Sequence, residues 1–271
     1  MAAAGRLLPS PELIDRTLRI ENSYSVSRMK VLESIPGNPV GIQFRPIGNS
    51  AIALMARHFP VPHFNKVVGL GGGQHADIEP LVGWYRENGI KPRFEILPRE
   101  DDADLCRELS RLGFYPTEFH TSLIRDTGPI AEHGADIERV AGTEAMEGFL
   151  DAYVAGWQLS ADVDGFKRNV RPWLDQPGWS LFLARVGGKP AATALLFVED
   201  GAGYLADASC DPIYRRRGLH MALLARRISE CRTAGTEFIC SGATFLSTSH
   251  RNMERAGLRI QFNRSIWTER T

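Results

Sequence analysis

The stretch "ASCDPIYRRRGLHMALL", residues 208–224, decides the fold of this chain. The residues up to Cys210 are expected to form a strand, and an apolar helical pattern starts near Gly218. A helix that begins after a short loop directs its free backbone N–H groups and its positive dipole end at one point. Arg215 and Arg216 can add charge-assisted hydrogen bonds there. The pattern favours a phosphate site, and the alternative is a solvated basic loop before an ordinary helix.

The composition shows why such positive charge has to act locally. The chain has 271 residues with 43% hydrophobic and 24% charged residues, enough for one large or two ordinary domains. Lysine plus arginine and aspartate plus glutamate both total 32, so the formal net charge is zero. We therefore expect no global attraction for nucleic acid or anionic lipid, and neither is expected as a partner.

The cysteines and the apolar segments indicate the compartment. The four cysteines form no C-x-x-C pair and no cysteine/histidine ligand spacing, so the sequence predicts a reducing environment and no metal site. The first residues lack the apolar run of a signal peptide, and no stretch is long enough to span a bilayer. We expect a cytoplasmic protein without a membrane partner.

The first half of the chain reads as a helix followed by alternating strands and helices. Ser10 is an N-cap candidate with Pro11 at the first helical position. Asp77 is the expected cap of a later helix whose apolar face holds Ile78, Leu81, Val82 and Tyr85. The predicted elements are a helix from residue 11 to about 35, strands at 40–44, 66–70, 92–97 and 119–125, and helices at 77–88 and 101–113.

The second half repeats a similar order. A helix at 144–158 precedes three strands with hairpin turns at residues 187–188 and 200–201, and a strand, a helix and an alternating strand follow the loop-and-helix stretch. A shift of about 144 residues overlays Phe94 on Phe238 and Gly113 on Gly257. This predicts a duplication with two similar lobes. The expected boundaries are 1–126 for the first lobe, 127–136 for a linker and 137–271 for the second lobe.

Residues 208–224 resemble the acetyl-coenzyme A (acetyl-CoA) signature of the GCN5-related N-acetyltransferase (GNAT) superfamily, R/Q-x-x-G-x-G/A. Arg215 and Gly218 match it, whereas His220 stands where the second glycine or alanine is expected. The resemblance covers 137–271, and the first half looks like a degenerate copy without the arginine–glycine loop. It implies a mixed α/β fold of two tandem lobes, each a central, mostly antiparallel sheet flanked by helices.

The resemblance also implies how acetyl-CoA would bind as a co-substrate. The strand edge would pair with the pantetheine arm, and the loop with the helix N-terminus would surround the pyrophosphate. The implied cofactor-binding residues are Ala208, Ser209, Cys210, Arg215, Arg216, Arg217, Gly218, Leu219, His220, Ser249 and Asn252. Ser249 also reads as a residue near a helix cap, and Asn252 as a surface amide.

Catalytic groups are harder to assign. Asp207 is the candidate base because a carboxylate in an apolar strand needs a partner or a raised pKa, although it also fits an exposed polar face. Met253 occupies the place where many relatives have a tyrosine acid, so a water or the hydroxyl of Ser247 or Ser249 would take that role. The Cys210 N–H is the expected oxyanion donor.

The resemblance implies that the segment with Trp157, Asp164, Phe166 and Trp173 forms a lid on the acceptor side. Its aromatic content fits either such a lid or packing between lobes. We expect an N-acetyltransferase acting on a primary amine of a small molecule or amino acid. Acetylation of a protein or peptide amine and a non-catalytic acetyl-CoA sensor are alternatives. A dinucleotide-dependent oxidoreductase is a weaker one, because the glycine motif near residue 70 has Gln74 at its third position. The sequence does not decide between a monomer and a homodimer.

Overall fold

The computed structural model describes residues 7–48, 51–59, 61–97, 99, 102–131 and 133–270. The start of the predicted first lobe and Glu132 of the predicted linker lie outside the described residues. The chain divides into two compact units. Unit 1 contains the residues up to Ile20 and Leu123–Gln261, and unit 2 contains Glu21–Ser122 and Phe262–Thr271.

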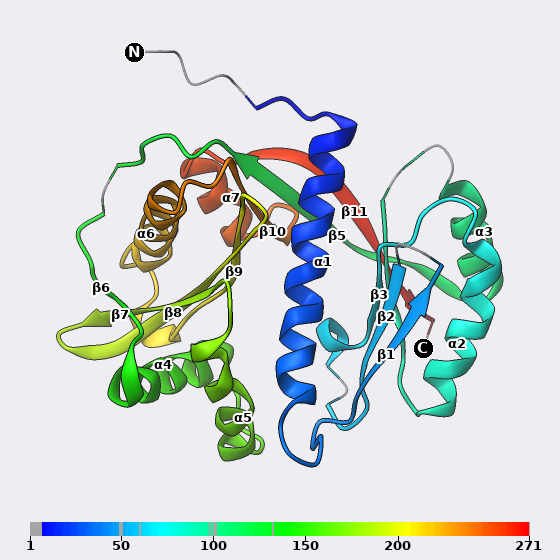
Figure 1. Cartoon of the computed structure of the whole chain (residues 1–271), viewed down its shortest axis with the longest axis horizontal. Helices are drawn as coiled ribbons and strands as arrows, with labels where there is room; N and C mark the ends of the chain where they lie inside the picture. The colour runs from blue at the N-terminus through cyan, green and yellow to red at the C-terminus, as the bar shows by residue number, and fades with distance from the viewer. Residues whose placement is uncertain are drawn as a thin grey trace. The chain divides into compact units, whose positions relative to one another are not determined.

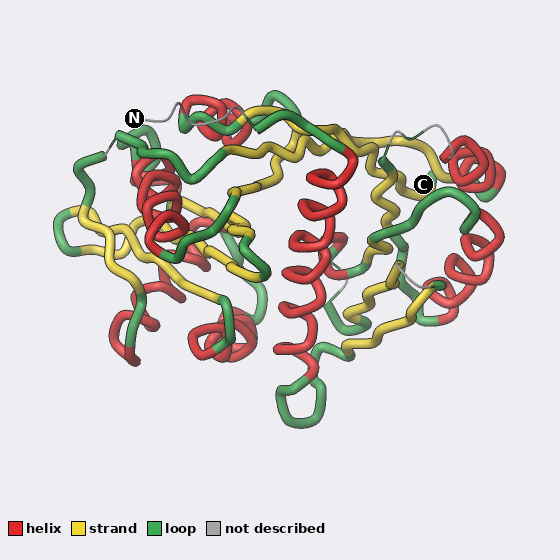
Figure 2. Tube along the Cα trace, turned by 45° about the horizontal axis from the view of Figure 1, so that its top comes forward, coloured by secondary structure: helices red, strands yellow, loops and turns green. Residues whose placement is uncertain are grey.

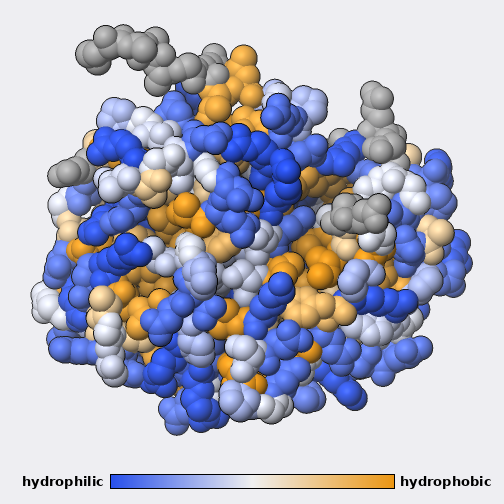
Figure 3. Space-filling model, in the orientation of Figure 1, coloured by the Kyte–Doolittle hydropathy of each residue, from blue (hydrophilic) through white to orange (hydrophobic). Residues whose placement is uncertain are grey.

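Helix α1 (Pro11–Glu33) contributes residues to both units and is one unbroken helix (Figure 2). Its start is the predicted one, because the Leu13 N–H donates to Ser10 Oγ at 3.2 Å and Pro11 has no N–H to satisfy. Within the described ranges, no helix combines the length and apolar character needed to cross a membrane. The face of the molecule in Figure 3 carries mostly hydrophilic residues with small hydrophobic areas between them.

Unit 1 is built on strands that neighbour one another in the order β10-β9-β8-β7-β6. The strands β7, β8 and β9 form antiparallel pairs through the two predicted hairpin turns, and β9 and β10 are parallel. Its elements are β6 (Asp136–Arg139), α4 (Gly142–Trp157), α5 (Val163–Val170), β7 (Trp179–Val186), β8 (Lys189–Glu199), β9 (Ala202–Cys210), α6 (Leu219–Thr233), β10 (Phe238–Thr244) and α7 (Thr248–Arg255).

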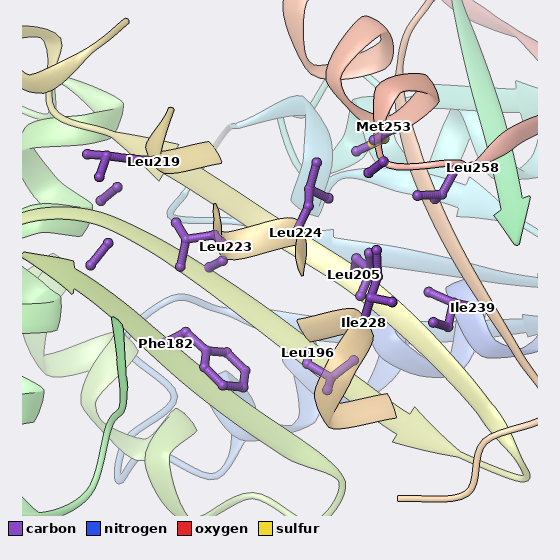
Figure 4. Packing of buried hydrophobic residues seen from close by; sticks show 14 of the residues in the cluster. Phe182, Leu196, Leu205, Leu219, Leu223, Leu224, Ile228, Ile239, Met253 and Leu258 are labelled. Carbon is purple, nitrogen blue, oxygen red and sulfur yellow. The ribbon is translucent and has the colours of Figure 1, made fainter. Parts of the chain in front are cut away.

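Two helices cover the two faces of this sheet. Helix α4 packs on one side of β8 and β9, and α6 packs on the other (Figure 1). The α6 side holds the main apolar core, in which Leu223 and Ile228 of the helix meet Leu196 and Leu205 of the strands (Figure 4). On the other side of the sheet, α4 lies close to the backbone of β9, since a Cβ added at Gly156 of this helix would lie 3.0 Å from the Cys210 nitrogen.

Unit 2 repeats part of this plan. Strands β1 (Ile42–Ile47) and β2 (Ala51–Ala56) form an antiparallel pair, β2 pairs antiparallel with β3 (Lys66–Val68), and β3 runs parallel to β4 (Arg93–Ile96). Helices α2 (Ile78–Glu87) and α3 (Ala103–Arg111) contribute to the core. The predicted face of α2, with Ile78, Leu81, Val82 and Tyr85, is buried.

The last long strand of each half contributes residues to both units. Strand β5 (Phe114–Arg125) supplies Leu123 to the core of unit 1 and neighbours β10. Strand β11 (Arg259–Glu269) pairs antiparallel with β4, and its Trp267 joins the core of unit 2. The units therefore do not follow a single cut in the sequence.

The structure departs from the sequence-based elements at several points. Strand β2, the short strand β6 and helix α5 were not predicted. The Asp77 side chain accepts no capping hydrogen bond, because His75–Asp77 form a 3-10 turn that runs directly into α2. The two glycines that the sequence shift overlays take similar conformations: Gly113 and Gly257 follow α3 and α7 with φ values of +88° and +86°.

Candidate functional site

The site begins where β9 separates from β10. Their parallel ladder pairs Phe238 with Ala202 and ends at Cys240 opposite Tyr204. Just beyond, the register between β8 and β9 shifts: Leu195 faces Ala206, but Thr193 faces Ser209. Two residues of β9 thus oppose one of β8, which is a β-bulge, and such bulges bend a strand. The end of β9 leaves β10 while it stays paired with β8.

The loop after β9 brings the backbone back as a helix start. The Asp211 carboxylate accepts from the Ile213 N–H at 3.0 Å and fixes the turn. Arg216 has φ +63° and Gly218 has φ +78°, so the chain twice takes the left-handed conformation before α6. No atom lies within 4 Å of a Cβ placed on Gly218. This position therefore favours glycine for its backbone angle and not for lack of space.

A cavity of about 590 Å³ lies between the end of β9, the start of α6 and the start of α7. The first residues of α6 carry backbone N–H groups that have no partner within the helix, and these residues line the cavity. Arg215 and Arg216 line it too, so the opening combines a helix N-terminus with two guanidinium groups. This combination suits an anion.

The structure brings most of the predicted cofactor residues together. Those that line the cavity are Ala208, Ser209, Cys210, Arg215, Arg216, Gly218, Leu219, His220, Ser249 and Asn252. Arg217 is not in the lining; its guanidinium lies over the Tyr214 ring, 5.7 Å from the centroid. Asp207 is also outside the lining, at the bulge, where it is half-buried with φ +38°.

His220 and Asn252 connect the two helices at the cavity. The Asn252 Nδ2 lies 3.0 Å from His220 Nδ1, and Asn252 Oδ1 accepts from Arg255 at 2.8 Å. Since Oδ1 is the acceptor, Nδ2 donates to the ring, which places the imidazole proton on Nε2. Burial, together with the smaller effect of the Arg227 charge, lowers the pKa of His220 to about 4. His220 is therefore neutral at pH 7 and acts as a hydrogen-bonding group.

The other residues considered for catalysis are buried in the core, cap a helix or have a thiol that stays protonated. Met253 is buried beside Leu258 in the core (Figure 4), so no hydroxyl occupies its place. Ser247 is the N-cap of α7 and accepts from the His250 N–H. Burial raises the pKa of the Cys210 thiol, so this group is a poor nucleophile at neutral pH.

The aromatic segment packs on itself in unit 1. Tyr153 stacks on Phe166 at 5.6 Å and meets Trp173 edge-on at 5.8 Å. Trp173 is buried, whereas Trp157 stays 46% exposed. Packing within the unit therefore accounts for Phe166 and Trp173, and Trp157 is the large aromatic side chain of this segment that remains open to solvent.

Sequence reasoning missed some of the lining. Met221 and Leu223 of α6 and Thr248 of α7 line the cavity in addition to the predicted residues. The first two read as core residues of an amphipathic helix, and nothing in the sequence marks Thr248. Gly156 was also not singled out, although its close approach to Ser209 brings α4 against the same segment of β9.

The alternative glycine motif near residue 70 uses its polar groups internally. Gln74 Oε1 accepts from the Gly71 N–H at 3.0 Å, and Gln74 Nε2 donates to the Ile47 carbonyl at 3.2 Å. The glutamine side chain thus occupies an amide that a dinucleotide phosphate would need. This arrangement disfavours the oxidoreductase interpretation.

The comparisons with known proteins agree with the geometry. Residues 129–244 match the family model of the acetyltransferase (GNAT) domain, Acetyltransf_6. The fold is similar to a GCN5-related N-acetyltransferase from Kribbella flavida (TM-score 0.66, 16% identity, 94% of this chain and 96% of that one). It is also similar to one from Sphaerobacter thermophilus (0.60, 14%, 89% and 84%).

A third similar structure is a tandem GNAT protein from the clavulanic acid biosynthesis pathway (TM-score 0.60, 11% identity, 96% of this chain and 97% of that one). No curated protein matches the chain. The fold class predicted from the sequence, a mixed α/β protein with a large sheet flanked by helices as in tandem GNAT proteins, is confirmed.

Proposed function

We propose that the chain is an N-acetyltransferase, a proposal that the match of residues 129–244 to the family model of the GNAT domain supports. It moves the acetyl group of acetyl-CoA directly onto a primary amine of a small molecule or amino acid. The observation that carries the proposal is the cavity at the bulge, where the end of β9, a helix N-terminus and two arginines meet.

The parts of the cavity suit the parts of the donor. Beyond Tyr204 the edge of β9 that faced β10 has left its ladder, and its backbone groups suit the amide-bearing pantetheine arm. The start of α6 with Arg215 and Arg216 suits the pyrophosphate. The volume of about 590 Å³ lies in the range of small-molecule sites.

The transfer needs few groups from the protein. The amine nitrogen of the acceptor attacks the thioester carbonyl, and the C–S bond breaks as the new C–N bond is completed. The Cys210 N–H is the proposed donor to the oxyanion. Asp207 is the proposed base, acting through water, since it lies at the bulge and outside the cavity lining. With Met253 in the core, water protonates the thiolate, whose pKa is about 8.5.

One observation favours a second candidate, a non-catalytic acetyl-CoA sensor. A methionine packed in the core takes the place of the acid, and His220 is neutral, so neither of these residues supplies the proton for the departing thiolate. Binding without transfer would follow if the acid is essential. Both candidates predict the same cofactor site and differ in turnover.

Titration calorimetry with acetyl-CoA tests the site, and thiol release with a panel of small primary amines and peptides tests the chemistry. We expect saturable binding that Arg215→Ala weakens, whereas Arg232→Ala, at the far end of α6, leaves it unchanged. Binding without thiol release would support the sensor. Absence of binding to the wild-type protein would refute both.

We also propose a cytoplasmic location. All four cysteines are free, and two of them are buried. Free thiols are typical of a reducing compartment. Fractionation of the source cells with an antibody to the protein tests this, and recovery outside the cytoplasm would contradict it.

A further inference from the structure

A buried arginine sits beneath the bulge that opens the cavity. Arg227 of α6 is only 1% exposed, and its partners in the described part of the chain are backbone carbonyls. Its Nε donates to the Leu223 carbonyl of its own helix at 3.0 Å. Its Nη1 donates to the carbonyls of Leu195 at 2.8 Å and Ala206 at 3.1 Å. Helix α6 is thereby tied to both strands.

These two carbonyls mark the place where the strands change register. Leu195 and Ala206 are the last pair of β8 and β9 before the bulge, and Asp207 follows with φ +38°. One guanidinium nitrogen bridges this pair at the point of bending. Ladder hydrogen bonds are disrupted at a bulge, so a side-chain donor is needed to satisfy the carbonyls there.

Ser241 of β10 acts on the neighbouring residue. The β9–β10 ladder ends at Tyr204 and Cys240, and the next residue of β10, Ser241, donates its hydroxyl to the Leu205 carbonyl at 2.7 Å. Ser241 is fully buried. Two consecutive carbonyls of β9 are thus held by side chains just where its separation from β10 begins.

Burying a cation whose hydrogen-bond partners are neutral carbonyls costs more free energy than burying an apolar side chain. Burial lowers the pKa of Arg227 to about 10, although the nearby Cys231 and Asp207 raise it. Apolar residues of similar volume often replace buried charges without loss of stability. Packing alone therefore does not account for an arginine at this position, and the bulge carbonyls supply the reason.

We propose that Arg227, with Ser241, is a positioning residue that keeps β9 bent away from β10 and so keeps the cavity for acetyl-CoA open. Its link to ligand binding rests on the function proposed above, whereas its action on the bulge does not. Removal of the guanidinium leaves the carbonyls of Leu195 and Ala206 without this donor. The end of β9 then loses its fixed direction, and the amides of Ser209 and Cys210 lose their placement in the cavity.

The test uses the full chain with Arg227→Met, Arg227→Lys and Ser241→Ala. Two controls are matched: Arg226→Met removes the neighbouring, partly exposed arginine, and Ile228→Val removes one buried methylene from the same core. Amide hydrogen exchange of the unliganded protein is measured at residues 206–210. The dissociation constant for acetyl-CoA and the thermal midpoint are measured in parallel.

We expect Arg227→Met to speed exchange at residues 206–210 and to weaken acetyl-CoA binding, each about tenfold, the ratio that 1.4 kcal/mol represents. Ile228→Val and Arg226→Met should leave the exchange rate at residues 206–210 and the acetyl-CoA affinity unchanged. Ile228→Val should still lower the thermal midpoint. Arg227→Lys should fall between, because an ammonium keeps the charge but not the fork. If Arg227→Met does not fold, the test rests on Arg227→Lys and Ser241→Ala. Amide exchange at residues 206–210 should then be faster in both variants than in the wild-type protein.

Protection at residues 206–210 equal to that of the controls would overturn the proposal, even if binding falls. If the wild-type protein does not bind acetyl-CoA, the proposed function fails, and the exchange measurements still decide the role of Arg227. If exchange rises but affinity is unchanged, Arg227 does not keep the cavity open, and the proposal is wrong.

Discussion

Gly156→Ala perturbs the site from the α4 side. A Cβ at this position would lie 2.5 Å from Ser209 Oγ, 2.8 Å from Ser209 Cβ and 3.0 Å from the Cys210 nitrogen. Rotating the Ser209 hydroxyl cannot relieve the contact, because Ser209 Cβ and the Cys210 backbone are fixed to β9. The hydroxyl is also held at 2.9 Å from Thr193 Oγ1. Either the last turn of α4 or the end of β9 must move.

Two opposing effects set the magnitude. Overpacking of a well-packed site costs about 1–3 kcal/mol. Replacing a helical glycine by alanine returns up to about 1 kcal/mol through helix propensity. We therefore expect Gly156→Ala to lose between about 0 and 3 kcal/mol in the free energy of unfolding. The displaced Cys210 amide should lower kcat more than it changes the affinity for acetyl-CoA.

Gly83→Ala in α2 is the matched control, since no atom lies within 4 Å of its added Cβ. It should gain up to about 1 kcal/mol. Urea unfolding at pH 7 measures both variants, and thiol release measures turnover. The reasoning is refuted if Gly156→Ala is stabilised as much as Gly83→Ala and keeps full turnover.

Three further predictions concern single side chains. Arg215→Ala should weaken acetyl-CoA binding by about 1–3 kcal/mol in calorimetry, and an unchanged dissociation constant would count against the site. Asp207→Asn should lower turnover without altering acetyl-CoA affinity, and unchanged turnover would exclude it as the base. The pKa of His220 is lowered to about 4 from 6.5, so the unfolded chain binds the proton first and stability falls as the pH drops from 6.5 to 4. His220→Gln should flatten that loss in pH-dependent urea unfolding; an equally steep loss would contradict the assignment.

The sequence predicted most of the second half because its signals are local. Gly187-Gly188 and Asp200-Gly201 mark the hairpins, and a proline-containing loop followed by an arginine–glycine run marks the start of α6. Helix α5 was missed because "DVDGFKRNV" has few apolar residues and a glycine in its middle. Strand β2 lies in a uniformly apolar run, "AIALMA", which fits a helix as well as a strand.

The site was predictable to the extent that it is contiguous. The strand end, the loop and the helix start follow one another in the chain, so their residues fall together in the cavity. The bulge could not be predicted, since it depends on how β9 pairs with β8 and "YLADASC" shows no sign of an extra residue. The role of Arg227 was equally hidden, because the helix pattern alone reads it as a polar neighbour of the buried stripe.

The sequence position of β11 determines when unit 2 can be completed during synthesis on the ribosome. Residues 21–122 emerge early, but the strand that completes their sheet, β11, is synthesised after every other element. Until then the edge of β4 stays unpaired, and Trp267 is missing from the core. Open strand edges invite association with other chains. The half that is made first therefore cannot complete its sheet until β11 has been synthesised.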